Sequence, residues 1–423
     1  MNKLVIKKKS LAGLLLVGTV MVLVYNPYGF FSVSLNVAKI IFLAISIFTI
    51  FTLLFMRQNA QKQKQFFKSD IAKQIMLPDI LIMVFSLAVS FLNPTQYDVS
   101  GSTLYMFTSR LLMITFIWSC LCIFGERAIN YFFWGCALSY LYTLVKYFID
   151  MGIVEGLRQA SISGSYNLTI EVHNMTYIFG YLFLYFLLMD SVSSKKSKWI
   201  KVFLCLVFVY FGQKRLIFVS IVIVLFIWWI LHRLKAKDRK WIVRIGSIVL
   251  LVTAVLYIYA IISGLFERIV VSNDIETSSR LRFYMYFAKD LPFSPFYFGK
   301  GITYTDEVMA SSAGMAALEL TQATTLHNDV LRLYIGIGMI PSFLYMGYVI
   351  YMRTIAMQKE YNERVGFCCF AMTMAYFMNW FASNAGLEMW CYSGYIFCIM
   401  TIMYKSYFSQ TGSTAVKQRK IEG

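Results

Sequence analysis

The sequence predicts an all-α polytopic integral membrane protein with about twelve transmembrane helices, and three observations carry this prediction. First, 59% of the 423 residues are hydrophobic and only 14% are charged, whereas a soluble domain is usually about 45–50% apolar and about 25% charged. Second, apolar runs recur along the whole chain, and about 20 apolar residues suffice for a helix to cross a bilayer. Third, basic residues collect between alternate runs. A soluble globular enzyme, a disordered chain and a disulfide-stapled secreted domain are therefore excluded.

Twelve runs qualify as candidate spans, of which the first and the seventh are short. They cover residues 11–25, 35–56, 75–92, 104–124, 128–149, 176–193, 199–212, 216–232, 241–263, 328–352, 365–382 and 388–407. Lys7-Lys8-Lys9 precedes the first run as in a signal peptide, but no small-residue cleavage site follows it, so we expect a retained span. We predict a single transmembrane domain over residues 1–423. Its longest inter-span stretches are 264–327, a large partly helical loop before the tenth span, and 150–175.

Basic residues outnumber acidic residues by 39 to 21, which gives a formal charge of +18. Twenty-seven of the basic residues fall at the termini or in alternate loops, which the positive-inside rule places in the cytoplasm. Both termini are then cytoplasmic, as an even number of spans requires, and the stretches 264–327 and 150–175 are extracytoplasmic. The larger of these loops holds more acidic than basic residues, so nucleic-acid binding is excluded.

The twelve other basic residues lie on the outer side or in outer halves of spans, where the positive-inside rule disfavours them. They are Lys39, Arg110, Lys146, Arg158, Lys214, Arg215, Arg268, Arg280, Arg282, Lys289, Lys300 and Arg332. Asp79 and Arg110 are isolated charges inside spans, and each is a functional candidate because such charges are costly. The eight cysteines include no CxxC pair, so neither a metal site nor a disulfide framework is predicted.

The first candidate site is the turn Gly212-Gln213-Lys214-Arg215, which separates two apolar runs with almost no loop between them. It is a tight outer turn or a broken helix with two cations at membrane depth. Ionisable residues there usually line a cavity or a substrate path, although long basic side chains also snorkel to the interface. Arg215 is the stronger candidate, because a guanidinium contacts phosphate in a planar bidentate manner and keeps its charge when buried.

The second candidate site is the segment 277–290. Ser278 is a typical N-cap residue, and apolar residues at helical spacing predict an amphipathic helix that lies on the membrane surface. Those residues are Leu281, Tyr284, Met285 and Ala288. Arg280 and Arg282 point about 200° apart on a regular helix, so they cannot both face one site. An irregular loop is predicted to follow, with its breakers at Pro292, Pro295, Gly299 and Gly301.

The third candidate site is Leu326-His327-Asn328-Asp329, at the start of the tenth span. A helix N-terminus favours anions and disfavours a protonated imidazole, so His327 is a ready general base. The alternative is that His327 caps the helix or bonds to the loop. Asn328 and Asp329 are expected to cap the helix. Close packing and a kink are predicted further along this span, at Gly336, Gly338 and Pro341.

These features occur in a recognisable order: an Arg at an outer turn between late spans, a large outer loop with an Arg-Leu helix and a Pro/Gly segment, and a re-entry through His-Asn into a Gly-rich span. The order resembles the bacterial O-antigen ligase and polysaccharide polymerase superfamily, which includes the Wzy-type polymerases. The matching residues are Arg280-Leu281, Tyr284, Pro292 or Pro295, Gly299-Lys300-Gly301, His327-Asn328, Gly336 and Gly338. The motifs cover residues 205–345. The chain departs from the family at Gln213-Lys214, where small residues are common, and in the aromatic run 293–298.

The resemblance implies a metal-independent membrane glycosyltransferase of the bacterial cytoplasmic membrane, with no cofactor. Its donor and acceptor would be oligosaccharides linked to polyprenyl pyrophosphate in the lipid bilayer, and a chain-length regulator would be a further partner. The residues fit this chemistry independently, since cations stabilise a pyrophosphate leaving group and no DxD-like acidic pair lies beside them. The predicted catalytic residues are His327, Arg215 and Arg280. The predicted substrate-binding residues are Lys214, Arg282, Asn328, Arg332 and Tyr284.

Two classes of acceptor substrate are possible within this family. A polymerase joins lipid-linked repeat units of a capsule, O-antigen or exopolysaccharide, whereas a ligase passes the finished glycan to a lipid A core or a protein. We favour the polymerase, because the loop matches ligases weakly and sequence divergence is typical of polymerases. A polysaccharide flippase or another transporter is the alternative from a different class. No convincing internal repeat is visible, however, and the cations cluster toward one face rather than at the bilayer midplane.

Overall fold

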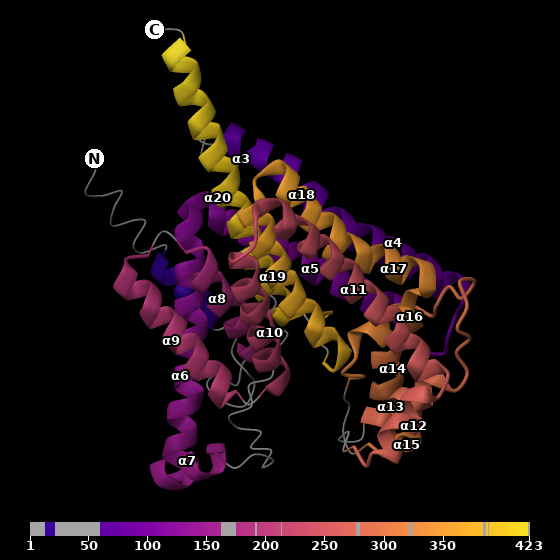
Figure 1. Cartoon of the computed structure of the whole chain (residues 1–423). Coiled ribbons are helices and arrows are strands. Elements are labelled where there is room, and N and C mark those ends of the chain that lie inside the picture. Colours follow the sequence, from indigo (N-terminus) through magenta and orange to yellow (C-terminus); the bar gives the residue numbers. More distant parts are fainter. Residues whose placement is uncertain are drawn as a thin grey trace. The chain divides into compact units, whose positions relative to one another are not determined.

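The computed structural model describes residues 13–21, 60–161, 175–190, 193–212, 214–275, 280–320, 325–383, 386–387 and 389–421. Within these ranges every regular element is a helix (Figure 1), as the sequence predicts. Residues 13–21 are helical and lie inside the predicted first span. The second predicted span, 35–56, lies outside the described residues, as do Gln213 and the expected N-cap Ser278.

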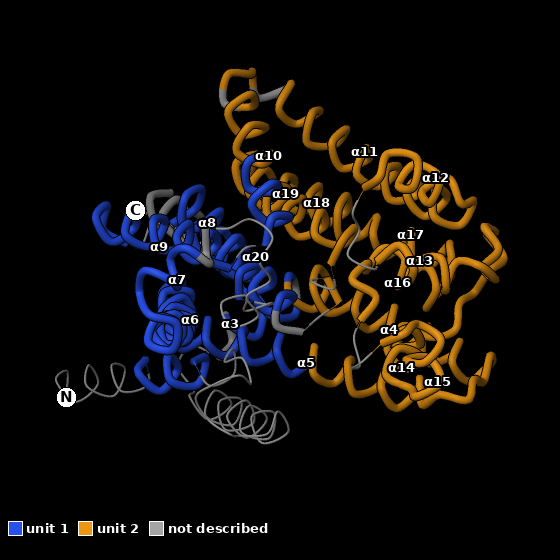
Figure 2. The backbone as a smooth tube through the Cα atoms, turned by 90° about the horizontal axis from the view of Figure 1, so that it is seen from below, with its two compact units in different colours: residues 1–70, 112–222, 390–423 blue, residues 71–111, 223–389 orange. Residues whose placement is uncertain are grey.

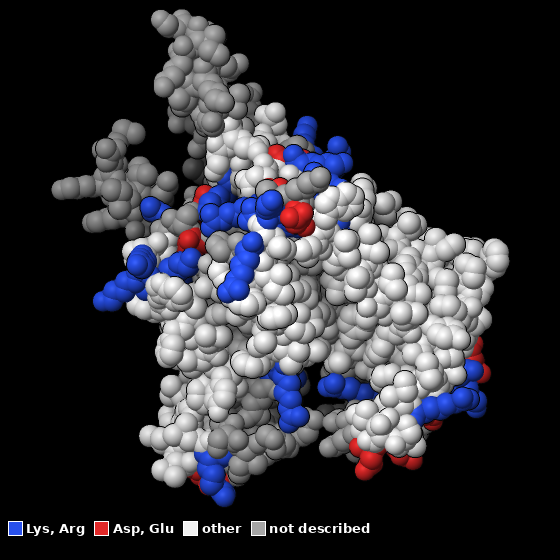
Figure 3. All heavy atoms as spheres, viewed as in Figure 1, with Lys and Arg blue, Asp and Glu red and all other residues white. Residues whose placement is uncertain are grey.

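Three stretches of the described chain are long and apolar enough to cross a membrane: Gln63–Leu92, Val99–Met151 and Asp238–Ile262. The first two contain α3 (Ala60–Phe66), η1 (Phe67–Met76) and α4 (Leu77–Leu92), and then α5 (Val99–Phe124), η2 (Gly125–Arg127) and α6 (Ala128–Met151). Figure 3 shows charged side chains gathered in separate groups on this face, with wide uncharged surface between them. This distribution is typical of helices that lie in lipid.

The chain divides into two compact units that interleave along the sequence (Figure 2). Unit 1 comprises residues 1–70, 112–222 and 390–423, and unit 2 comprises residues 71–111 and 223–389. Such a division is not visible in the sequence, which predicts one domain over residues 1–423, because each unit draws on segments that are distant along the chain.

Unit 1 is built around α8 (Met175–Leu188), in which every residue except Leu187 is buried. Aromatic rings fill the space beside it, and the rings of Phe179 and Phe208 lie 4.6 Å apart. Lys201 is also internal: it is 2% exposed and donates to the side-chain oxygen of Asn130 at 2.5 Å. This lysine, one of those assigned to the cytoplasmic face, therefore has a structural role. Besides α8 and the helices bounded above, unit 1 contains α7 (Ile153–Ser161), α9 (Lys195–Phe211), the start of α10 (Arg215–His232) and α20 (Met389–Ile421).

Unit 2 contains α4, the first half of α5, most of α10 and all elements from α11 to η4. Their bounds are α11 (Ala236–Ile262), α12 (Leu265–Ser272), α13 (Arg280–Ala288), α14 (Tyr304–Ala310), α15 (Ser312–Ala317), α16 (Asp329–Ile337), α17 (Met339–Gly347), η3 (Tyr348–Met352), α18 (Arg353–Glu360), α19 (Glu363–Met378) and η4 (Asn379–Phe381). The predicted large loop is therefore partly helical, with α12 to α15 inside it.

The predicted tenth span, residues 328–352, is not one regular helix. It breaks at Gly338, whose φ of +77° ends α16 at Ile337 and lets α17 begin at Met339. Only glycine adopts this conformation without strain. The predicted kink is confirmed and is sharper than expected.

Two pairs of glycines, Gly299 with Gly301 and Gly336 with Gly338, hold the loop that follows α13 against this break. A Cβ on Gly338 would lie 1.9 Å from the carbonyl oxygen of Tyr297, and a Cβ on Gly299 would lie 2.4 Å from that of Gly336. The amide of Gly301 donates to the Gly336 carbonyl at 2.7 Å, which satisfies one of the open carbonyls at the end of α16. The loop and the broken helix thus meet backbone to backbone, and the predicted close packing is confirmed.

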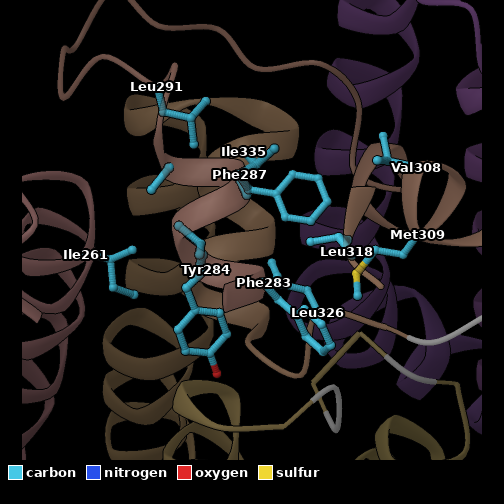
Figure 4. Packing of buried hydrophobic residues seen from close by; sticks show 12 residues of the cluster. Ile261, Phe283, Tyr284, Phe287, Leu291, Val308, Met309, Leu318, Leu326 and Ile335 are labelled. Carbon is cyan, nitrogen blue, oxygen red and sulfur yellow. The ribbon is translucent and has the colours of Figure 1, made fainter. Parts of the chain in front are cut away.

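The helix predicted after Ser278 is α13, but it does not lie on a membrane surface. Its buried residues are Phe283, Tyr284, Phe287 and Ala288. Figure 4 shows Phe283 and Phe287 within a cluster that includes Met309 and Leu318 from the region of α14 and α15, and Ile335 from α16. The predicted surface helix is wrong, because the two phenylalanines widen the apolar face and pack it into a protein core.

Asp79 and Arg110 are not isolated charges. Arg110 Nη1 lies 3.1 Å from Asp79 Oδ1, and neither side chain is more than 3% exposed. The hydroxyl of Tyr345 donates to the same carboxylate oxygen at 2.9 Å. Each charge therefore neutralises the other, which is the usual arrangement inside a membrane span.

Candidate functional site

His327 stands immediately before α16 in a backbone conformation that is rare for its residue type. Its φ is +51°, in the left-handed region that costs a non-glycine residue about 1–3 kcal/mol. The next residue, Asn328, is the N-cap: its side-chain oxygen accepts from the amide of Leu331 at 3.0 Å. The predicted capping role of Asn328 is confirmed, and this cap holds the turn that presents the half-buried imidazole of His327.

A second hydrogen bond holds the same turn from α13. The hydroxyl of Tyr284 donates to the carbonyl oxygen of His327 at 3.2 Å. Figure 4 shows this hydroxyl directed away from the apolar cluster that surrounds the ring. The Asn328 amide donates to the hydroxyl of Tyr257 at 3.2 Å, and Tyr257 donates to the carbonyl oxygen of Phe381 at 2.9 Å. Tyr257 of α11 thus joins the site from a third helix.

Arg280 supplies positive charge to this group of hydroxyls. Burial raises the pKa of Tyr284 to about 12, and the positive charge of Arg280 is the largest influence that opposes the rise. The guanidinium is half-buried at the first residue of α13. Tyr284 therefore stays protonated at neutral pH and remains a donor, while the site keeps one cation at its edge.

Arg282 lies on another face of α13, as the spacing predicts. It is exposed and forms an ion pair with Glu319. An exposed pair of this kind contributes about 0–1 kcal/mol, so it leaves the guanidinium easy to displace. None of the described contacts of Arg282 is with Arg280, Tyr284, His327 or Asn328.

Arg332 is held in the protein interior. Its side chain is 7% exposed, it forms an ion pair with Asp306, and its Nη1 lies 3.7 Å from Asp329 Oδ1. Burial is the largest influence on Asp306 and raises the pKa of that carboxyl, and the charge of Arg332 opposes the rise. Two carboxylates already neutralise this guanidinium, so the geometry favours a structural role for Arg332 over the predicted contact with substrate.

Asp329 extends this group toward the end of α19. One carboxylate oxygen accepts from the amides of Gly386 and Leu387 at 2.6 and 3.1 Å. The carbonyl oxygen of Gly386 in turn accepts a hydrogen bond from Arg110 at 2.8 Å. The expectation that Asp329 caps its own helix is wrong: Asn328 is the N-cap, and the Asp329 carboxylate instead anchors a distant backbone segment to the start of α16.

The cationic turn of the first candidate site lies in unit 1. α9 ends at Phe211, and α10 begins at Arg215, so the turn is as tight as the sequence predicts. A Cβ on Gly212 would lie 2.0 Å from Thr176 Oγ1, which explains the glycine. Lys214 is half-buried and Arg215 is exposed. Both stand at the N-terminus of α10, where the helix dipole repels cations and attracts anions.

The structure thus groups Arg280, Tyr284, His327 and Asn328 in unit 2, separates Arg282 and buries Arg332. Tyr257 was missed by sequence reasoning, because a tyrosine near the end of a span is equally typical of the membrane interface. Within the described ranges no cluster of three or more His, Cys, Asp or Glu residues is arranged to hold a metal ion. The sequence matches no model of a known protein family, and no curated protein matches it.

Proposed function

We propose that this protein is a polysaccharide repeat-unit polymerase, which joins oligosaccharides carried on polyprenyl pyrophosphate. The observation that carries the proposal is the convergence on one helix start of a base, a cation and two tyrosine hydroxyls. His327 precedes α16, Tyr284 fixes its carbonyl, Asn328 links to Tyr257, and Arg280 stands at the edge. General-base transfer to an electrophile with an anionic leaving group uses a base and a cation that stabilises the developing charge.

The proposed reaction forms one glycosidic bond and breaks one bond to pyrophosphate. His327 takes the proton of the acceptor hydroxyl as the oxygen attacks the anomeric carbon of the donor. The bond between that carbon and the pyrophosphate oxygen breaks, and the polyprenyl pyrophosphate leaves with the electron pair. Arg280 stabilises the negative charge that develops on the leaving group. In this proposal cationic side chains do this work without a metal ion.

Arg215 and Lys214 enter the proposal through the chemistry of their own turn in unit 1. Two cations at the N-terminus of α10 are unfavourable for the helix by themselves. Together with the open amides of the first turn they suit a phosphate group. We therefore propose that they bind a phosphate group of a lipid-linked substrate, with Arg215 as the principal contact because a guanidinium can contact phosphate in a bidentate manner.

The proposed setting is the bacterial cytoplasmic membrane, with twelve spans, cytoplasmic termini and the residues 264–327 outside. A reaction on lipid-linked substrates needs the site at the membrane surface, where the pyrophosphate lies. The helices of the described residues, three stretches of which are long and apolar enough to cross a membrane, support the membrane part of this setting. The donor and acceptor lipids would be the main partners, with a chain-length regulator as a further one.

A reconstituted assay tests the proposal. Purified full-length protein in proteoliposomes is given a polyprenyl-pyrophosphate-linked repeat unit, and the products are separated by size. We expect a ladder of multiple repeats that is lost, by roughly 100-fold or more, in His327→Ala and Arg280→Ala. A ligase would consume the donor only when a lipid A core or protein acceptor is added. A transporter would move the donor across the bilayer and form no new glycosidic bond. Either result would replace the proposal.

A further inference from the structure

The extracytoplasmic loop contains a stretch of exposed aromatic side chains that the proposed reaction does not use. Phe296 is 81% exposed, Phe298 is 54% exposed and Phe293 is 38% exposed. No charged residue occurs between Asp290 and Lys300. We name residues 292–298 the aromatic ledge. Contiguous exposed apolar surface of this kind marks a contact with a partner or with lipid.

One edge of the aromatic ledge continues the apolar surface of α11. The rings of Phe293 and Tyr259 lie 5.2 Å apart, and Tyr259 is itself 47% exposed near the end of α11. Further exposed apolar residues follow down the same helix at helical spacing: Leu256, Val252, Val249, Ile248 and Ile245. The stretch Asp238–Ile262 of this helix is long and apolar enough to cross a membrane. Phe293 therefore extends an exposed apolar stripe on this helix.

The other edge of the aromatic ledge meets the start of α17. A Cβ on Gly338 would lie 2.8 Å from the Cα atom of Phe298, so the two backbones are in direct contact. α17 begins at the next residue, and its exposed apolar side chains are Ile340 and Leu344, which are 50% and 68% exposed. The ledge thus joins exposed apolar surface on both sides within unit 2.

Part of the backbone of the aromatic ledge is bonded within the protein. Two of its seven residues are Pro292 and Pro295, which have no amide hydrogen. Three other amides have partners in the protein: Ser294 donates to the Tyr334 hydroxyl at 3.4 Å, Phe296 to the Ser294 hydroxyl at 3.2 Å, and Tyr297 to the Ser294 carbonyl at 3.2 Å.

Three carbonyl groups of the aromatic ledge also have partners in the protein. The Pro292 carbonyl accepts from the Tyr334 hydroxyl, the Ser294 carbonyl from the amide of Tyr297 at 3.2 Å, and the Tyr297 carbonyl from the amide of Met339 at 3.3 Å. An irregular segment in the hydrocarbon core is tolerated only where the protein satisfies its polar groups. The other polar groups of the ledge therefore need partners from lipid headgroups or water.

We infer that the aromatic ledge lies at the bilayer interface, with the rings of Phe296 and Phe298 among the acyl chains of the leaflet that α11 and α17 enter. The inference rests on the membrane setting of the proposed function but not on the reaction. Lipid contact explains the exposed rings, and headgroups or water serve the backbone groups that the protein does not bond. The close-packed glycines then link a lipid-anchored segment to α16, the helix that follows His327.

Nitroxide accessibility tests this inference. The full chain with Phe296→Cys is spin-labelled in lipid nanodiscs, and collision rates with oxygen and with a nickel chelate are measured. The unsubstituted chain is labelled in parallel, since seven native cysteines are buried and Cys122 is partly buried. Leu344→Cys on α17 is the lipid reference, and Asp290→Cys, exposed just before the ledge, is the water reference.

We expect the label at position 296 to resemble Leu344→Cys, with oxygen contact several-fold above nickel contact. A label as open to nickel as Asp290→Cys would place the aromatic ledge in water and overturn the inference. Spectral broadening that vanishes on dilution with unlabelled protein would show a second copy on this surface instead, which also overturns it. Phe298→Cys repeats the test should the first variant misfold. None of these outcomes depends on glycosyl transfer, so the proposed polymerase activity is tested separately.

Discussion

The hydroxyl of Tyr284 donates a hydrogen bond to the carbonyl oxygen of His327 at 3.2 Å, across 43 residues of sequence. His327 has a left-handed backbone, so its conformation needs support from outside its own turn. Tyr284 provides this support from the core of the segment 264–327, where its ring belongs to the buried cluster of α13 and lies 6.2 Å from the ring of Phe266. The relationship ties the proposed base to the packing of α13.

Removal of this hydroxyl should impair the reaction more than the fold. We expect Tyr284→Phe to lower product formation at least about tenfold, and to lower the free energy of unfolding by about 1 kcal/mol, the usual value of one hydrogen bond. Polymer assays and thermal unfolding in detergent measure the two effects. Tyr286→Phe is the matched control, because Tyr286 is 41% exposed on the same helix. Equal activity in both variants would remove Tyr284 from the site.

The break in the tenth span should depend on Gly338 itself. Gly338→Ala introduces a strained φ and a Cβ only 1.9 Å from a backbone oxygen, so we expect a loss of more than about 2 kcal/mol in stability. Gly264→Ala has a similar φ of +72° but meets no atom within 4 Å. We expect it to cost about 1 kcal/mol. Both variants introduce backbone strain, but only Gly338→Ala introduces a steric clash, so their melting temperatures distinguish the two effects. Equal melting temperatures would contradict the close packing of Gly338 against Tyr297.

Arg332 should matter for folding through the carboxylates that it neutralises. Arg332→Met leaves the buried Asp329 and the half-buried Asp306 without their cation, and we expect a loss of about 3–5 kcal/mol at neutral pH. Asp306→Asn should cost much less, since burial already disfavours the charged carboxylate. Thermal unfolding of the two variants at neutral pH makes the comparison. Similar losses would favour a different role for this ion pair.

The pH dependence of the Arg332→Met variant has a definite sign. Burial raises the pKa of Asp306 above its ordinary value of 3.8, so the folded protein binds a proton more tightly than the unfolded chain does. Stability then falls as pH rises from about 3.8 through the raised value. Loss of the Arg332 charge strengthens this effect. We therefore expect the variant to recover stability on acidification, and a defect that grows toward low pH would contradict this explanation.

Topology can be tested with a single thiol on α15. Ser312 is exposed and lies in the loop 264–327, which we assign to the outside. A membrane-impermeant maleimide should modify Ser312→Cys in intact cells, and the unsubstituted chain gives the background from native thiols. Labelling that appears only after permeabilisation would reverse the proposed orientation.

Much of the fold follows from hydropathy alone. Helices occupy the ranges predicted for the spans at 104–124, 128–149, 241–263 and 365–382, because each is a long apolar run bounded by polar residues. The break at Gly338 was expected only as a kink. Its sharpness depends on the loop glycines that contact it, and such long-range backbone contacts leave no periodic signal.

The candidate site was predicted less completely. The motif at His327-Asn328 and the divergence of Arg280 from Arg282 follow from short-range geometry, and both agree with the structure. Tyr257 and the partners of Arg332 could not be found in this way, because they are brought in by packing between distant helices. The surface helix was misplaced because hydrophobic periodicity shows which face is apolar and not whether lipid or protein covers it.

The polymer length made in cells tests the central claim most directly. His327→Ala and Arg215→Ala are introduced into the native polysaccharide locus, with Lys289→Ala, an exposed loop cation, as the control. Membrane insertion is verified by immunoblot, and surface polysaccharide is resolved by size. We predict that both site variants insert normally yet yield only single repeat units, whereas the control yields long chains. Long chains in both site variants would contradict the assignment of His327 and Arg215 to catalysis.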